Sequence, residues 1–117
     1  MPHFIIECSE SILKPYDEKS ILKQIHTAAY ATGLFNEADI KVRLKPFKTP
    51  FVDGQYLDFI HVFAHIMQGR TAVQKSKLSK VIVSLLTTMY PDIANIAMSV
   101  SDFDRDAYFN RTMIDSN

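Results

Sequence analysis

The stretch Pro2-His3-Phe4-Ile5-Ile6-Glu7-Cys8 begins at the second residue of the chain and is rich in branched and aromatic side chains. Because it contains no turn signal, it predicts a β-strand over Pro2–Cys8. Chain ends are normally frayed, so an apolar strand that starts this early implies a terminus docked into the fold. If Met1 is removed, Pro2 becomes a secondary amine at the start of a buried strand.

Two further elements complete the first half of the chain. Apolar residues recur on one helical face between Asp17 and Thr32, and Gly33 supplies a left-handed C-cap, which predicts a helix there. From Ile40 to Lys45, apolar residues alternate with cations, as in a strand with one apolar and one basic face. We expect Pro46 and Pro50 to break or border that strand.

The second half repeats this order after the turn Asp53-Gly54-Gln55. A long strand is predicted over Leu57–Met67, apolar on both faces apart from two histidines. Thr71 and Gln74 form a capping-box pattern for a second helix that Pro91 ends. The range Ile93–Phe103 is again typical of a strand, and a polar tail follows it.

The order strand, helix, strand, then strand, helix, strand predicts two similar β-α-β units in one domain over residues 1–117. The fold class is α+β, with a four-stranded mixed sheet and two helices on one face. Two helices cover only one face of such a sheet. Since two of the predicted strands are apolar on both faces, we expect a homo-oligomer whose subunits pack through their sheets.

Composition excludes several classes of protein. Thirteen Lys and Arg balance thirteen Asp and Glu, so the chain lacks the basic excess of many nucleic-acid binders. The longest apolar run is far shorter than the roughly 20 residues needed to cross a bilayer, so we expect no membrane segment. One cysteine, Cys8, and an N-terminus without a basic leader indicate a cytoplasmic protein.

Two groups of residues are candidates for chemistry. A Pro2 amine whose pKa is lowered by burial or nearby cations is suited to general base catalysis near neutral pH. Proline also follows Met1 in many chains without any catalytic role. A second group is suited to binding carboxylates. It consists of the cations Lys41, Arg43 and Lys45 of the predicted strand and of Arg70, just before a predicted helix. The alternative is a solvated edge strand whose charges discourage aggregation.

The remaining polar residues indicate no metal site or cofactor. His61 and His65 share one face of a strand but lie roughly 13 Å apart, too far to hold one metal ion. Buried or interface histidines are the simpler interpretation. Cys8 is expected to be a buried structural thiol. No phosphate-binding loop or zinc motif is present in the sequence.

Seven segments, taken in order, resemble the 5-carboxymethyl-2-hydroxymuconate isomerase family of the tautomerase superfamily over essentially the whole chain. They are Pro2–Ser9, Ala31-Thr32-Gly33-Leu34-Phe35, Ile40 with Arg43, Asp53-Gly54-Gln55, Phe59-Ile60-His61, Gly69-Arg70 and Phe109-Asn110. The resemblance implies a homotrimer that ketonises a carboxylated dienol without metal or organic cofactor. It makes Pro2 the general base and acid, and Arg43 and Arg70 the catalytic and substrate-binding clamps.

The resemblance also implies that Lys41 and an aromatic residue near the C-terminus lie at the substrate. Lys41 stands where the family is expected to have an arginine, which keeps the charge but loses the two-pronged guanidinium. Phe109 or Tyr108 is expected to wall the pocket, from this subunit or a neighbour, and core or interface packing explains these aromatics equally well.

Other functions remain open at this level. They are a related tautomerase with another substrate, a non-catalytic trimeric ligand-binding or scaffold protein on the same fold, and an RNA-binding module. The last is disfavoured because the open sheet face is expected to carry aliphatic side chains rather than exposed aromatics. The partners expected are therefore a small carboxylated dienol and two further copies of the chain, with no nucleic acid and no membrane.

Overall fold

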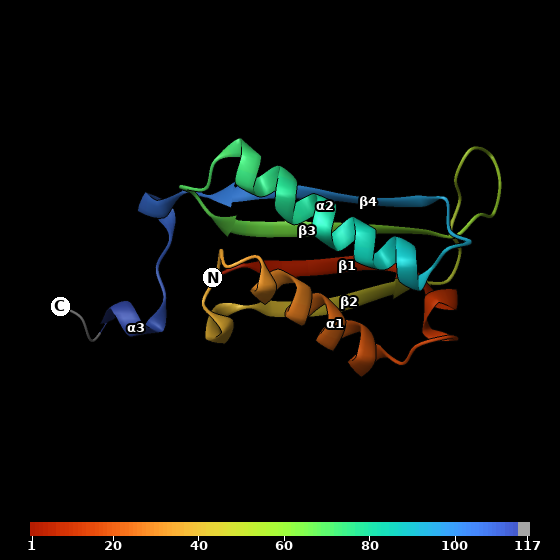
Figure 1. The fold of residues 1–117 in the computed structure, drawn as a ribbon, viewed down its shortest axis with the longest axis horizontal. Helices are drawn as coiled ribbons and strands as arrows, with labels where there is room; N and C mark the ends of the chain where they lie inside the picture. The colour runs from red at the N-terminus through yellow and green to blue at the C-terminus, as the bar shows by residue number, and fades with distance from the viewer. Residues whose placement is uncertain (115–117) are drawn as a thin grey trace.

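A computed structural model describes residues 1–114 of the chain, and residues 115–117 lie outside it. Two β-α-β units follow one another along the sequence (Figure 1). The first contains β1 (His3–Ser9), α1 (Glu18–Ala31) and β2 (Lys41–Phe47). The second contains β3 (Phe59–Met67), α2 (Ala72–Met89) and β4 (Asn95–Phe103). Every predicted helix and strand is therefore present, with ends that differ by up to two residues.

The four strands form one mixed sheet in the order β2-β1-β3-β4. Within each unit the two strands are parallel, as predicted, whereas the units join through the antiparallel pair β1 and β3. Both long helices lie across the same face of this sheet (Figure 1). The predicted α+β class, a four-stranded mixed sheet with two helices on one face, is confirmed.

The helices begin and end where local signals place them. The Asp17 carboxylate accepts the backbone N–H of Ser20 at the start of α1. Thr71 and Gln74 form the predicted reciprocal capping box at the start of α2. After α1, Gly33 has a φ of +76°, the left-handed conformation that favours glycine at a helix C-terminus.

The core lies between the sheet and the two helices. Alternate residues of β1 and β3 are fully buried because strand side chains point to opposite faces. The helices contribute the apolar positions that face them. The largest fully buried side chains include Phe4, Ile6, Ile21, Ile25, Ile60, Ile66, Leu78, Ile82 and Leu86.

The opposite face of the sheet, the open face, has no helix over it, and its alternate positions on β1 and β3 are only partly buried. Its large side chains are mostly aromatic, contrary to the expected aliphatic surface, because Phe59, Phe63 and Phe103 take outward positions of β3 and β4. The prediction that β3 is apolar on both faces is correct, but in this single chain only the inner face is buried. What covers the open face stays a prediction.

Each of the four strands has a boundary that differs from expectation. Pro46 lies inside β2 rather than ending it, because β2 is an edge strand and a missing N–H costs least there. β1 starts at His3, one residue after Pro2. Leu57 precedes β3 and is 42% exposed, and Ile93 precedes β4, so apolar character extended both predictions too far.

The chain leaves the sheet after β4 as an irregular segment with two short helical turns, Arg105–Ala107 and Arg111–Ile114. This C-terminal segment projects from the end of the sheet at which β1 starts (Figure 1). Its residues Phe109 and Ile114 are more than 60% exposed. Within residues 1–114, no helix is long and apolar enough to cross a membrane.

Candidate functional site

Pro2 lies at the start of β1 and is fully buried. Its carbonyl oxygen accepts a hydrogen bond from the backbone N–H of Lys41 at 3.0 Å, which ties the first residues to β2. The predicted docking of the terminus into the fold is therefore confirmed. Met1 precedes Pro2 in this chain, so the Pro2 nitrogen is here an amide without basicity.

Met1 lies next to Pro2, and its contacts show which groups surround the start of the chain. Its amino group lies 3.6 Å from a carboxylate oxygen of Asp39, and its sulfur accepts a hydrogen bond from the Tyr108 hydroxyl. Burial lowers the pKa of the Met1 ammonium below its ordinary value, and Lys41 and Arg70 lower it further, whereas Asp39 opposes the shift. An amine at this place is thus both desolvated and close to cations.

Arg43 extends from β2 on the open face and contacts the first residue of β1, His3. Its Nη1 donates to Nδ1 of His3 at 3.1 Å. Because Arg43 follows Lys41 by two residues, both cations take outward positions of β2. The structure therefore places Arg43 beside the first residues of β1, as a clamp for substrate near Pro2 would require.

Arg70 lies at the same end of the molecule, in the connection between β3 and α2. Its guanidinium donates to the carbonyl oxygen of Leu34 at 2.5 Å and to that of Met67 at 3.4 Å, and it lies 5.1 Å from the centre of the Phe35 ring. These contacts fix Arg70 between the ends of α1 and β3. They explain its position without a ligand, while its charge still acts on the chain terminus.

The other cations of β2 differ in their surroundings. The Lys41 ammonium donates to the carbonyl oxygen of Asp39 at 2.7 Å, so it stays near the terminus. Lys45 is exposed and lies four residues further along the strand. By strand rise that is roughly 13 Å from Lys41. Lys45 therefore fits the solvated edge strand better than it fits the site.

Aromatic rings border this end of the open face. The Phe103 ring lies about 6 Å from three others, those of His3, His65 and Tyr108. Tyr108 rather than Phe109 contacts Met1 in this chain, because Phe109 is 64% exposed on the projecting C-terminal segment. The role of Phe109 in a pocket wall stays a prediction.

His65 borders this cluster through its ring contact with Phe103, whereas His61 and Cys8 lie outside it. His61 lies nearer the start of β3, where its Nε2 is 3.1 Å from the Ser99 hydroxyl. Cys8 is fully buried, as predicted, and burial raises the pKa of its thiol to about 12. Among residues 1–114, no three His, Cys, Asp or Glu side chains lie close enough to hold a metal ion.

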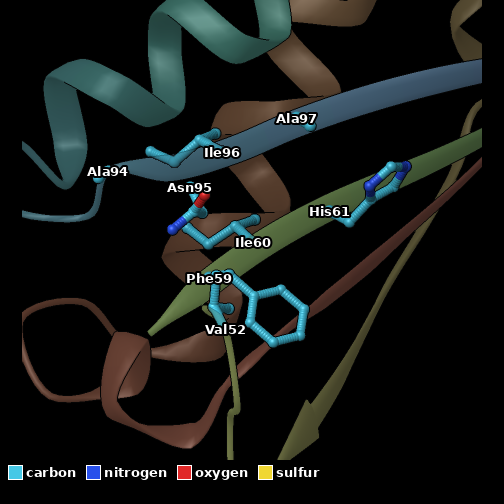
Figure 2. Close-up of a pocket in the computed structure, with 8 residues that line it drawn as sticks. All are labelled: Val52, Phe59, Ile60, His61, Ala94, Asn95, Ile96 and Ala97. Atoms are coloured by element: carbon cyan, nitrogen blue, oxygen red, sulfur yellow. The ribbon is translucent and has the colours of Figure 1, made fainter. Parts of the chain in front are cut away.

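A cavity of about 330 Å³ lies at the opposite end of the sheet, where β3 and β4 start (Figure 2). It is lined mainly by apolar side chains, and its ionisable residue is His61. The cavity begins at Phe59, six residues before His65, which is about 20 Å along β3. The hollow therefore lies apart from Pro2 and offers no cation for a carboxylate.

Sequence reasoning missed two neighbours of the predicted site. The pairing of His3 with Arg43 was open to prediction, because both take outward positions at the start of parallel strands. Asp39 gave no comparable signal. It precedes β2 in a 3₁₀ turn over Glu37–Asp39, and only the folded chain brings it to the amino terminus.

A buried terminus after a removable Met, flanked by arginines on a double β-α-β fold, defines a tautomerase-type site. Comparison with known proteins supports the class. Residues 2–115 match the family described as 5-carboxymethyl-2-hydroxymuconate isomerase. The chain belongs to this family of the tautomerase superfamily, and it is a delta-isomerase-like tautomerase.

Individual relatives agree with the assignment. The chain is 27% identical over 107 residues to 5-carboxymethyl-2-hydroxymuconate Delta-isomerase of Escherichia coli, covering 89% of this chain and 84% of that protein. A crystal structure of a 5-carboxymethyl-2-hydroxymuconate isomerase from Deinococcus radiodurans R1 superposes with a TM-score of 0.80 at 17% identity, covering 94% and 88% of the two chains. A macrophage migration inhibitory factor-like protein from Entamoeba histolytica gives 0.74 at 14% identity, covering 94% and 95%.

Proposed function

We propose that this chain ketonises a carboxylated 2-hydroxymuconate-type dienol, namely 5-carboxymethyl-2-hydroxymuconate, with Pro2 as general base and acid once Met1 is removed. One observation carries the proposal. Pro2 is fully buried directly before β1, next to the Met1 amine, whose pKa burial, Lys41 and Arg70 lower against the opposing effect of Asp39. A lowered pKa leaves part of the amine unprotonated at neutral pH, as a general base requires.

In the proposed reaction the Pro2 nitrogen takes the proton of the enol hydroxyl. The resulting prolinium then returns a proton to a distant carbon of the conjugated chain, so the carbonyl forms and the amine is regenerated. The guanidinium of Arg43 binds a substrate carboxylate and stabilises the negative charge of the dienolate, with Arg70 and Lys41 adding to the positive field. Proton transfer of this kind needs no metal or organic cofactor.

A homotrimer packed through the open faces is part of the proposal. The open face has no cover in the single chain, and a relative of similar fold is a wild-type symmetric trimer of a fused 4-OT, with a TM-score of 0.77 at 16% identity over 89% of this chain and 88% of that one. The exposed Phe109 projects on a segment beyond the sheet. In a trimer such a segment reaches a neighbour, where Phe109 would wall the pocket.

The identity of the substrate rests on family membership and on the number of cations near Pro2. Lys41 in place of the expected arginine favours a second candidate, a related tautomerase acting on an enol acid with fewer carboxylates. A lysine binds a carboxylate as a point charge and selects its geometry less strictly than a guanidinium does. The two candidates are distinguished by a panel of mono- and dicarboxylic enols.

The test begins with the intact mass of untagged protein and continues with the spectrophotometric decay of the dienol on the same sample. We expect loss of Met1 and turnover that falls by at least about 100-fold in Pro2→Ala, the usual contribution of a general base. Pro50→Ala, the same change in a distant loop, is the control and should keep full activity.

Two results would overturn the proposal. Turnover by a protein that retains Met1 would exclude the Pro2 amine as the base. Loss of Met1 without turnover of any dienol acid would exclude the substrate class. Activity confined to monocarboxylic enols would favour the second candidate instead.

A further inference from the structure

The hydrogen bond between His3 and Arg43 determines the protonation state of the imidazole. Arginine has only donors, so Nδ1 of His3 must be the acceptor at 3.1 Å. An imidazolium has no acceptor. His3 is therefore neutral when the contact forms, with its proton on Nε2, and the contact cannot survive protonation of the ring.

His3 is held in place by more than this bond. It lies on β1 directly opposite Lys41 of β2 and His65 of β3. Its ring meets the Phe103 ring of β4 edge to face, with centroids 6.0 Å apart. An imidazole fixed between three strands is a firm support for the long Arg43 side chain, which extends from an edge strand and is otherwise exposed.

The groups around His3 disfavour its charged form. Arg43 and Lys41 of β2, the amino terminus and His65 of β3 act on it, and the carboxylate on the same face of β1, Glu7, is four residues away. Burial lowers the pKa of His3 below its ordinary value of 6.5, and the neighbouring cations lower it further. The neutral acceptor therefore persists through neutral pH and is lost only on the acid side of 6.5.

We infer that neutral His3 is a positioning residue that aims Arg43 at a substrate carboxylate, and that its protonation releases Arg43 and weakens substrate binding at acid pH. The inference rests on the proposed function, because it requires that Arg43 bind the carboxylate. It assigns no proton transfer to His3. Its effect is expected mainly in KM, with a smaller loss in kcat because Arg43 also stabilises the dienolate.

Two substitutions separate the acceptor from the ring. His3→Phe keeps an aromatic ring against Phe103 but removes the acceptor, and we expect KM for the dienol to rise about tenfold with a smaller fall in kcat. His3→Asn places an amide oxygen near the position of Nδ1 and does not titrate. It should retain a KM close to that of the parent protein.

The pH profile distinguishes positioning from a merely structural role. In the parent protein, KM should rise as the pH falls through the lowered pKa of His3, and this rise should be absent in His3→Asn. An unchanged KM in His3→Phe, or the same acid rise in His3→Asn, would overturn the inference.

A measurement without substrate separates this inference from the proposed function. Nitrogen-15 NMR of the imidazoles at neutral pH should show His3 protonated at Nε2 and bare at Nδ1, with the Nδ1 signal shifted by Arg43→Ala. A protonated Nδ1 would overturn the inference even if the enzyme turns over the dienol. A parent protein without turnover would refute the proposed function, and the NMR result would still decide the His3 contact.

Discussion

The two β-α-β halves pair their strands in the same way but place different chemistry at the same end of each pair. In the first half His3 lies opposite Lys41, and in the second Phe59 lies opposite Asn95. The outward residues of β2 from Lys41 to Lys45 are cations, whereas those of β4, from Asn95 to Phe103, are all uncharged. The start of the first half therefore carries the candidate site, and the start of the second carries the apolar cavity of Figure 2.

The comparison shows that a repeated fold does not by itself decide which half carries the functional site. Each half begins with a strand whose first residue lies opposite the first residue of its parallel partner, but only β1 begins beside Met1. A terminus supplies an amine that no internal strand offers. The fold thus provides two similar frames, and the proposed function uses the one that carries Pro2.

The largest expected effect is a loss of stability on removing a buried side chain from either half. Comparing the two losses tests whether both halves contribute equally to one core. Ile25 of α1 and Ile82 of α2 are both fully buried. Each change to Ala should lower the free energy of unfolding by about 2–5 kcal/mol, because it removes buried methyl groups and leaves a cavity. Chemical denaturation at equal protomer concentration measures both values. Val73→Ala, at a side chain 78% exposed, is the control with an expected change below about 0.5 kcal/mol. If only one of the two isoleucine variants lost much unfolding free energy, the two halves would not share a common core.

The next effect tests the charge difference between the halves. Arg43→Ala should raise KM for the dicarboxylic dienol roughly 10- to 100-fold, as expected for the loss of a charged hydrogen bond. Lys45→Ala removes an equal charge further along the same strand and should change KM less than about threefold, because exposed charges contribute little. Steady-state kinetics measures both. Equal effects would mean that the basic strand attracts substrate only through its overall field.

The smallest effect compares the starts of the two helices. Asp17→Ala and Thr71→Ala each remove a side chain that accepts a backbone N–H, and each should cost about 1 kcal/mol of stability. Thermal and denaturant unfolding provide the measurement. Thr87→Ala is the matched control, since its hydroxyl donates to a carbonyl within α2 and caps nothing. A cap whose removal has no effect would indicate a helix held by packing alone.

Regular spacing made most of the fold predictable. The alternation of Ile40, Val42 and Leu44 with cations gave β2 its two faces, and Gly33 marked the end of α1 correctly. Local sequence signals predicted strand ends wrongly where the position of a strand in the sheet decides whether a residue fits. Pro46 is tolerated because β2 is an edge strand, which no local pattern reveals.

The roles of the candidate site residues stay predictions, and the sequence revealed only some of their neighbours for a similar reason. The sequence singled out Pro2, Arg43 and Arg70, and the structure places them at one end of the molecule. It missed Asp39, whose contact with the terminus joins residues 38 positions apart. It also gave no sign that Arg70 donates to the carbonyl oxygen of Leu34, because backbone acceptors carry no residue identity.

The sequence by itself determined the elements, their order and the buried face of each strand, because side-chain periodicity records which positions avoid water. It also determined that any amine at the terminus is a proline once Met1 is gone. Only the tertiary structure decided which charges surround that proline. Asp39 and Lys41 lie at the start of β2 and Arg70 follows β3, and all three act on the Met1 amine next to Pro2 because the sheet brings these ends together. Electrostatic effects depend on distance in space, and the order of residues does not encode that distance.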